Sequence, residues 1–524
     1  MKFKNISRLL LIGAICAQVG CDKDFVAVNT SPYQINDIDP ELLFAGAMRT
    51  YMHGWETEST IVQHFVNPFN QGATLGHNFN EDIDNFNNGR WDGTFTSSIK
   101  NMVQALALLD KSGANRPNLR SMLRIWKAQV FMGLVDSYSN VPYTEAGKAY
   151  LENIFFPKYD DAATIYADLE KEIRESIAAL TPTGDYVSGD LFFGKNARIP
   201  ITNAATQVAQ WKKLGNSLLL RLGMRYSKAN PTKAASIALE AFNGGVMTSN
   251  NDNAMVRYDG TLFTNGPNGN LVNNNPRFYY AAEPFVNQLK NTNDPRTKFL
   301  VAAFPNPNNP LDPNANVDYT IANQFGVPVG VLSTTIQAGA PYRGSRGSGL
   351  NYSQINVRCV ASQTAPTFWV TYAQTALLLA EAAHRGWIPG GAAAAKTFYE
   401  NGIKADMDVY TLFPNGTAVT TAEKDAYLAQ PNVAFDAANA LNLINTQYWI
   451  ANITNGMEAW ANFRRSGFPA LQPNRFNNNL NGGFVRRLSY PDYETANNAD
   501  NYNAAVQAIG GKDDLITRVF WDRP

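Results

Sequence analysis

The side chains best suited to catalysis are few and scattered along this sequence. No two of the histidines, His53, His64, His77 and His384, have the spacing of a zinc site. Neither a Cys-x-x-Cys pair nor a Gly-x-Ser-x-Gly nucleophile elbow is present. The 44 acidic residues allow many carboxylate pairs of the kind that hydrolyse glycosides, yet nothing singles one pair out. We therefore predict no catalytic residue, no metal and no cofactor.

One segment imitates a phosphate-binding loop. Gly189–Lys195 has the glycine and lysine spacing of such a loop, but the loop needs Ser or Thr next to hold magnesium, and here Asn196 follows. A strand should come before it, whereas Pro182–Ser188 is turn-like. We interpret the segment as a surface turn.

Loop aromatics and amides are better candidates, for non-covalent binding. Aromatic rings stack on flat apolar faces while amides bond to polar edges, which suits sugars and peptides. Each candidate could instead be a loop anchor packed into the core, and for Trp91, just before a predicted helix, we favour that role. Trp126, Trp211 and Trp460 are predicted to be core residues. The ligand-binding candidates are Trp55, Phe69, Asn70, Arg90, Trp91, Arg277, Tyr279, Tyr280, Tyr342 and Arg343.

The N-terminus has the pattern of a secretory signal. A basic head is followed by the apolar run Leu9–Ala17, which is too short to span a bilayer. Gly20-Cys21 then resembles the lipobox of bacterial lipoproteins, although Gln18 departs from the usual Leu. We predict a signal peptide over residues 1–20, acylation of Cys21, and a polar tether over 21–40. The alternative is an ordinary signal peptide with a chance cysteine.

Cysteine usage and charge limit the function further. If Cys21 carries lipid and Cys16 leaves with the signal, Cys359 has no partner for a disulfide, and we expect it to be a buried small hydrophobic residue. Removal of three signal-peptide cations leaves 41 basic residues against 44 acidic ones. That balance argues against nucleic acid as a partner.

Helical patterns dominate after the tether. Between Asp161 and Leu180, apolar residues recur every fourth position with charged residues between them, which is typical of an amphipathic helix. Several patterns are separated by short breaks, as in helical-hairpin repeats. The other predicted helices begin at Asp39-Pro40-Glu41 and cover 97–110, 121–138, 202–225, 231–242, 370–384, 392–409 and 437–461.

The middle of the chain differs from the rest. From about Gly244 to Pro366, Asn, Pro and Gly are crowded together, which favours turns and irregular loops. Long loops in a folded domain commonly bind something. We predict one domain over 41–524, with a loop-rich insertion around 244–366.

Five segments in order carry a family resemblance: Phe131–Ala146, Trp211–Leu222, Ala380–Trp387, Asn455–Pro469 and Arg486–Pro491. Behind a lipoprotein signal, they resemble the SusD/RagB-like outer-membrane lipoproteins of the Bacteroidetes. Asp22-Lys23-Asp24 is similar to the surface-export signal of lipoproteins in that group. One departure is Gln374, where the family often has Glu. We expect most of these motif residues to support the fold, including Asn216, Arg221 and Arg225.

The resemblance implies a mainly α fold, with tetratricopeptide-like helical pairs supporting a loop-rich ligand-binding region. It implies a lipid-anchored protein on the outer membrane surface that captures an oligosaccharide or a peptide. The partner would be a SusC-like TonB-dependent transporter, and the chain would not be an enzyme. Two alternatives stay open: an exported glycan- or peptide-active enzyme on a helical scaffold, and a structural surface protein.

Overall fold

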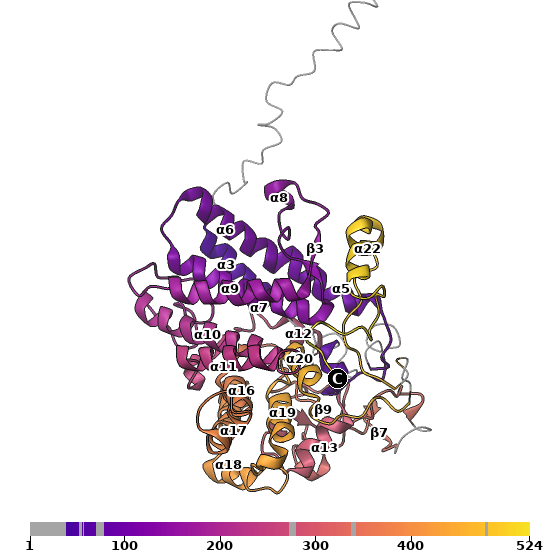
Figure 1. The fold of residues 1–524 in the computed structure, drawn as a ribbon. Helices are drawn as coiled ribbons and strands as arrows, with labels where there is room; N and C mark the ends of the chain where they lie inside the picture. Colours follow the sequence, from indigo (N-terminus) through magenta and orange to yellow (C-terminus); the bar gives the residue numbers. More distant parts are fainter. Residues whose placement is uncertain are drawn as a thin grey trace, which may run out of the picture. The chain divides into compact units, whose positions relative to one another are not determined.

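A computed structural model describes residues 38–51, 55, 57–69, 78–271, 279–336, 342–476, 480 and 482–524. Pro40–Pro524 forms one compact unit in which helices predominate (Figure 1). Among the residues of these ranges, no helix combines the length and apolar character that a bilayer crossing needs. The predicted Cys21 anchor and the candidates Asn70 and Arg277 lie outside the described residues.

The first half of the chain folds into the helices that its periodicity predicted. Their ends follow local signals: the Asp161 side chain accepts a hydrogen bond from Thr164 N at 2.8 Å, and Asn203 accepts one from Thr206 N at 2.9 Å. Gly113 ends another helix with a φ of +64°, a conformation that glycine adopts without strain. The helices are α3 (Pro40–Thr50), α6 (Lys100–Ser112), α7 (Pro117–Tyr138), α9 (Ala162–Ala179), α10 (Ala204–Arg225) and α11 (Pro231–Gly244).

The last third is helical as well, with one correction to the sequence prediction. The predicted helix 437–461 is two helices, because the chain turns at 452–455 and Asn455 caps the second by accepting from Glu458 N. The helices are α16 (Tyr372–His384), α17 (Gly391–Asp408), α18 (Thr421–Leu428), α19 (Ala440–Ala451), α20 (Gly456–Ser466), α21 (Glu494–Asn497) and α22 (Ala499–Ala508).

The region rich in Asn, Pro and Gly contains short regular elements that its composition concealed. A four-stranded antiparallel sheet has the order β1 (Phe65–Val66), β5 (Tyr280–Ala281), β9 (Gln354–Ile355), β6 (Val301–Ala302). Two-residue strands are too short for alternation to be visible in a sequence. The remaining strands are β2 (Val141–Pro142), β3 (Tyr159–Asp160), β4 (Ala254–Val256), β7 (Ser345–Arg346), β8 (Gly349–Leu350) and β10 (Thr367–Val370). The remaining α-helices are α4 (Glu58–Ile61), α5 (Asp84–Gly93), α8 (Ala149–Glu152), α12 (Gly266–Gly269), α13 (Glu283–Asn291) and α14 (Thr297–Leu300). A π-helix covers Thr94–Ile99, and short 3-10 helices cover Asn250–Asp252, Ile321–Asn323, Val409–Leu412 and Ala437–Asn439.

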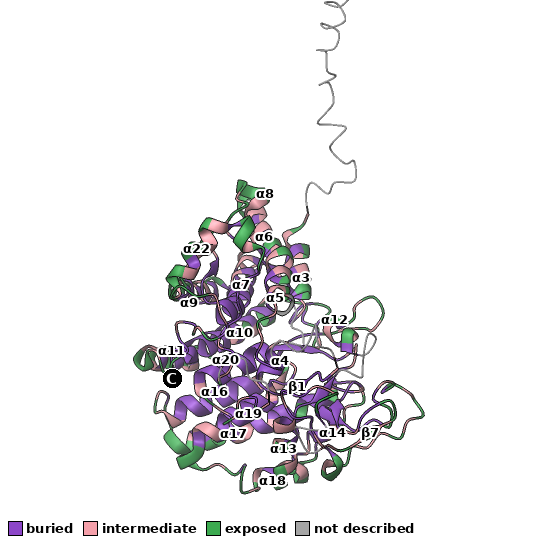
Figure 2. Cartoon of the chain, turned by 90° about the vertical axis from the view of Figure 1, so that its right-hand side faces the viewer, coloured by how far each residue is buried: buried purple, intermediate pink, exposed green. Residues whose placement is uncertain are grey.

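Neighbouring helices pack in pairs, as the sequence pattern predicted. α7 packs on α9, α10 on α11 and α16 on α17, and α16 also contacts α10 and α19. The facing surfaces of α7, α16, α19 and α20 make up much of the buried interior (Figure 2). Trp126, Trp211 and Trp460 are buried there, which confirms that they are core residues.

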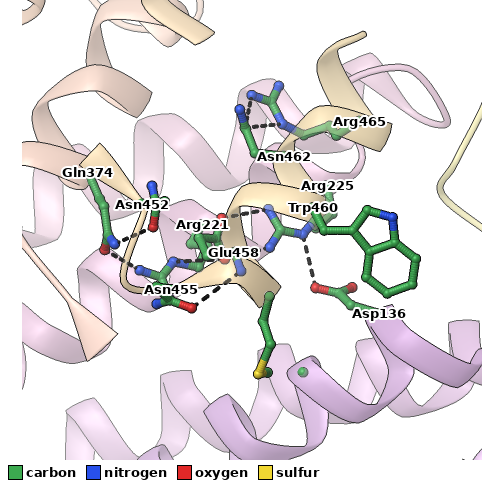
Figure 3. A network of polar contacts seen from close by, with 12 residues as sticks. Asp136, Arg221, Arg225, Gln374, Asn452, Asn455, Glu458, Trp460, Asn462 and Arg465 are labelled. Atoms are coloured by element: carbon green, nitrogen blue, oxygen red, sulfur yellow. Dashed lines mark hydrogen bonds and ion pairs between the residues drawn. The ribbon is translucent and has the colours of Figure 1, made fainter. Parts of the chain in front are cut away.

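A buried network of charges joins helices that are far apart in the sequence (Figure 3). The Arg225 guanidinium on α10 pairs with Asp136 of α7 at 3.1 Å and with Glu458 of α20 at 2.7 Å. All three side chains are almost inaccessible to solvent. Burial by itself raises the pKa of Glu458, but Arg225 and then Arg221 lower it below its usual value, so the carboxylate stays charged.

Gln374 belongs to the same network. Its side chain completes a capping box with Thr371 at the start of α16 and accepts a hydrogen bond from Arg221. Its amide nitrogen donates to Asn452 Oδ1 at 2.7 Å. The amide can accept and donate at once, which a carboxylate cannot do.

Replacing Arg225 by Met is expected to destabilise the fold strongly, because the buried Asp136 would lose the cation that it pairs with and Glu458 would keep only Arg221, at 3.5 Å. The free energy of unfolding should fall by about 3–5 kcal/mol. The control is Arg120→Met, which breaks an exposed pair with Asp110 and should cost about 0–1 kcal/mol. Urea unfolding followed by circular dichroism measures both. Equal losses in the two variants would refute the role given to the buried network.

Candidate ligand-binding groove

An open hollow of about 650 Å³ lies between three segments that are distant in the sequence. Its walls are α13, the stretch 431–446 that leads into α19, and the stretch 469–475 that follows α20. The volume is in the range of small-ligand sites. We refer to this hollow as the amide groove, because Asn and Gln are the most frequent residues in its lining.

Helical geometry places these amides on the groove side. In α13, Phe285 and Leu289 are buried, so Gln288 and Asn291 lie toward the less buried side. Around the start of α19, Asn439 and Asn442 line the groove, while Ile444 is buried. Residues three or four apart share one face of a helix, which accounts for both pairs.

The third wall is held by hydrogen bonds to the first half of the chain. Gln63, buried beside β1, donates from Nε2 to the carbonyl of Gln472 at 2.7 Å. Asn474 donates from Nδ2 to the carbonyl of Asn78 at 3.0 Å. These bonds fix an irregular segment that has no helix or strand of its own, so the groove has a defined wall.

Most groove amides keep their hydrogen-bonding capacity. Within the described part of the chain, the side chains of Gln288, Asn291, Asn432, Asn439 and Gln472 make no hydrogen bond to another residue. Each amide can donate twice and accept twice, which matches the alternating donors and acceptors of a hydroxylated ligand. The groove can therefore bind a polar ligand, and that ligand need not be charged.

Charged side chains are few in the groove. Glu283 and Arg475 approach each other at 3.9 Å and so partly offset one another, and Asp436 is exposed at the opposite wall. Exposed charges of this kind interact weakly in water. The lining gives little electrostatic reason for a strongly ionic ligand to bind.

An aromatic patch adjoins the amide groove, and Val329 belongs to both. The patch consists of partly buried side chains packed on the core around Tyr280 and Tyr352, namely Phe69, Phe325, Val329, Tyr342 and Phe476. Two cations lie over the Phe325 ring, Lys290 with Nζ 3.7 Å and Arg343 with Cζ 3.3 Å from its centroid. Burial and then the neighbouring Arg343 lower the pKa of Lys290.

Three of the predicted binding residues meet at this patch. Phe69 and Tyr342 pack against the same core cluster, and Arg343 covers Phe325. They come from two loops more than 270 positions apart, and the four-stranded sheet brings them together. These three retain accessible surface that a ligand can contact.

The other described candidates are buried and bond to the protein itself. Trp55 donates from Nε1 to Asn268 Oδ1 at 2.9 Å, and Arg90 pairs with Glu58 at 2.6 Å. Tyr280 accepts a hydrogen bond from Leu350 N beneath the patch. These side chains anchor the fold and present little surface to a ligand. Arg90 lies on helix α5 and Tyr280 on strand β5, and not in loops as the sequence predicted.

The aromatic rings among those candidates are anchors for the same reason. Trp91 is 5% exposed and contacts Tyr138, Tyr159 and Tyr490, which agrees with the core role favoured for it. Tyr279 stacks on Phe65 with ring centroids 5.1 Å apart. Trp91 and Tyr279 are thus buried by residues that are distant in the sequence, and this burial makes them anchors.

Reasoning from the sequence missed the amides of the groove. It concentrated on loop aromatics, whereas the groove amides lie on α13, at the start of α19 and in the 469–475 segment. A signal was available in Asn439, Asn442 and Thr446, which recur at helical spacing on one face. A polar face on a helix is normally read as solvated, so the pattern alone does not distinguish a binding wall from an ordinary surface.

Comparisons with known families and structures agree with one another. A family described as SusD-like, starch-binding and associating with the outer membrane matches residues 32–491. A solved chitin-binding protein is 29% identical, with 93% of this chain and 100% of that one covered and a TM-score of 0.75. A SusD-like protein from Bacteroidetes AC2a is 25% identical over 93% and 100%, with a TM-score of 0.79. A SusD homologue from Bacteroides uniformis is 24% identical over 93% and 100%, with a TM-score of 0.72. No curated protein matches the chain.

Two groups of potential chemical reactivity lie outside the groove and are buried. His64 stacks on Trp449 and donates to its carbonyl, and burial lowers the pKa of His64 to about 3. Cys359 is 2% exposed, as its predicted hydrophobic role requires, and burial raises the pKa of its thiol to about 12. In the described ranges, no group of three His, Cys, Asp or Glu side chains could hold a metal ion.

The buried Cys359 thiol is expected to be inert in the folded protein. At neutral pH it stays protonated, because its raised pKa is far above 7, and a thiol reagent cannot reach it. In a Cys21→Ser chain without the signal, Ellman's reagent should detect no thiol before unfolding and one per chain in guanidinium. Rapid labelling of the folded chain would contradict the assigned burial.

Proposed function

The chain belongs to the SusD-like family, whose members are described as associating with the outer membrane, and on that premise we propose that it captures an oligosaccharide at the cell surface. The amide groove is the observation that carries this proposal. It offers unpaired amide groups on three walls, few charges and an aromatic patch at its edge. Hydroxyl groups of a sugar would bond to the amides, and an apolar sugar face would lie on the aromatic patch.

Chitin oligosaccharides are the first ligands to test. A protein 29% identical to this chain is named as chitin-binding. The acetamido group of such a sugar carries a donor and an acceptor, which an Asn or Gln side chain pairs with in the same way. Peptides offer the same amide chemistry along their backbone and are the alternative cargo.

The proposed action is non-covalent capture followed by transfer to a SusC-like TonB-dependent transporter. Each hydrogen bond between exposed polar groups contributes a net free energy of only about 1 kcal/mol to binding, so the ligand can be released as well as bound. Energy for uptake would come through the transporter. The proposed arrangement also includes the lipid on Cys21, with the polar stretch after it as a tether to the outer membrane.

Removal of groove amides is expected to weaken sugar binding. Replacing Asn439 and Asn442 together by Ala should remove one or two hydrogen bonds and raise Kd roughly 5- to 30-fold, at about 1 kcal/mol per bond. Isothermal titration calorimetry with chitin oligosaccharides measures this loss. Asn314→Ala, at an exposed amide outside the groove, is the matched control and should leave Kd unchanged.

The same experiment discriminates between the alternatives. Sugar binding that survives the double substitution would move the site away from the amide groove. Binding of peptides and not of any glycan in a panel would change the cargo class. Turnover of a glycan or peptide by the purified chain would refute the proposal in favour of an enzyme.

Replacing Cys21 by Ser is expected to release the protein from the membrane, because the acylated thiol would be lost. Fractionation of cells expressing either chain, followed by immunoblotting, measures the distribution. A chain with Lys23→Ser keeps the thiol and should remain in the membrane fraction. If Cys21→Ser also stays there, the lipid anchor is not at this cysteine.

A further inference from the structure

A second hollow of about 300 Å³ adjoins the amide groove. It lies between the stretch 293–298 that follows α13, the helix α18 with Gln430 just after it, and residues 319–321. α13 and α18 lie at the same end of the folded unit in Figure 1 and Figure 2. The volume is at the lower end of the range for small-ligand sites. We refer to this second cavity as the side hollow.

The amide groove and the side hollow share two walls. On one wall, Asn291 and Thr292 line the groove, and the next residue, Asn293, lines the side hollow. On the other wall, Gln430 lines the side hollow, and the next residue, Pro431, lines the groove. Consecutive Cα atoms are only about 3.8 Å apart. The two cavities are therefore neighbours along both walls.

A buried hydrogen bond joins the floors of the two cavities. Gln447 lines the groove and donates from Nε2 to the hydroxyl of Tyr427, which lines the side hollow, at 2.8 Å. Arg296 donates to Gln447 Oε1 at 2.8 Å and to the Tyr427 hydroxyl at 3.0 Å. All three side chains are buried. One cation thus holds both floors, so the two cavities keep a fixed position relative to each other.

The helix α13 gives the groove a direction that leads to the side hollow. Glu283 at its start and Asn291 at its end both line the groove, so the groove follows the whole helix. Its nine residues rise about 13 Å. The side hollow begins at Asn293, just after the helix has ended. A chain-like ligand that lies along α13 therefore continues into the side hollow.

The chemical character of the side hollow is close to that of the groove, with an aromatic ring added. Tyr319 is 37% exposed, and Asn293 is exposed as well. Among the described residues, neither the Tyr319 hydroxyl nor the Asn293 amide has a hydrogen-bond partner. The accessible charges form a pair, Lys298 Nζ with Glu423 Oε1 at 3.3 Å. A ring beside neutral polar groups suits a sugar, as in the groove.

The segment that carries Tyr319 is ordered by backbone hydrogen bonds. Ala303, next to β6, and Asp318 donate to each other's carbonyls at 3.0 and 3.1 Å. Gln324 also donates from Nε2 to the carbonyl of Asp318, at 2.9 Å. Because the neighbouring backbone is fixed, the ring of Tyr319 needs little reordering when a ligand arrives.

We propose that the side hollow is a second subsite for the oligosaccharide held in the amide groove, so that the protein binds long sugar chains more tightly than short ones. The inference rests on the proposed function, because it takes the groove as the first sugar site. One part of a long chain would occupy the groove, and the units that follow would reach Tyr319. Contacts made by one linked ligand strengthen each other, because the second contact forms at a high effective concentration.

Chitin oligosaccharides of two and six units test this inference by isothermal titration calorimetry. The protein is the Cys21→Ser chain without the signal. A two-unit sugar is short enough to bind in the groove alone, whereas a six-unit sugar can extend into the side hollow. Tyr319→Ala should raise the Kd of the six-unit sugar roughly 3- to 10-fold, the range of an aromatic contact, and leave the Kd of the two-unit sugar unchanged.

Three further variants make the test specific. Gln430→Ala, at another lining residue of the side hollow, should also weaken only the six-unit sugar. Asn439→Ala with Asn442→Ala in the groove should weaken both sugars. Tyr150→Ala removes a tyrosine that is 81% exposed on α8 and lines neither cavity, and it should change neither Kd. An unchanged Kd for the two-unit sugar also shows that a variant has kept its fold.

The outcomes separate this inference from the proposed function. Equal Kd values for the two sugars with the unsubstituted protein, or equal effects of Tyr319→Ala on both, would overturn the side hollow and leave the groove as the sugar site. Two six-unit molecules per protein would also overturn it, because the cavities would then act separately. If the unsubstituted protein binds neither sugar, the proposed chitin cargo is refuted and the inference with it.

Discussion

A buried cation on α10 holds together parts of the chain that are more than 300 positions apart. Arg225 pairs with Asp136 of α7 and Glu458 of α20, and removing Arg225 would leave the buried Asp136 without the cation that it pairs with. The position of α20 is therefore coupled to the first helical pairs. The groove depends on this coupling because two of its walls flank α20 in the sequence. α19 lies just before α20, and the 469–475 stretch follows it.

A second buried cation links elements that form two walls of the groove. Arg296, fully inaccessible to solvent, pairs with Asp294 and with Asp406 of α17, and donates to Gln447 of α19 at 2.8 Å. It lies five positions after the end of α13, so it ties the chain leaving one groove wall to the helix of another. Rigid walls matter for a site whose individual hydrogen bonds are weak, since the amides need no reordering when a ligand arrives.

The interior of the fold contains charged side chains, whereas the groove is lined mainly by neutral polar ones, and this difference has a physical reason. Inside, charged groups are retained because each is paired and hydrogen-bonded, and they specify which helices meet. In the groove, neutral amides remain in water and lose little when they exchange water for a ligand. Such a surface suits repeated capture and release, whereas a buried ionic site would bind by a large and costly desolvation.

The sequence by itself determined most of the long helices, the family resemblance and the hydrophobic role of Cys359, although it joined α19 and α20 into one helix. These follow from local periodicity, from side chains such as Asp161 and Asn203 that bond their own backbone, and from burial preference. Tertiary structure alone decided that Trp55 and Tyr280 face inward and that neutral amides from three distant segments line one groove. Whether a loop aromatic is an anchor or a contact depends on which distant residues cover it, such as Asn268 over Trp55. No pattern within the loop contains that information.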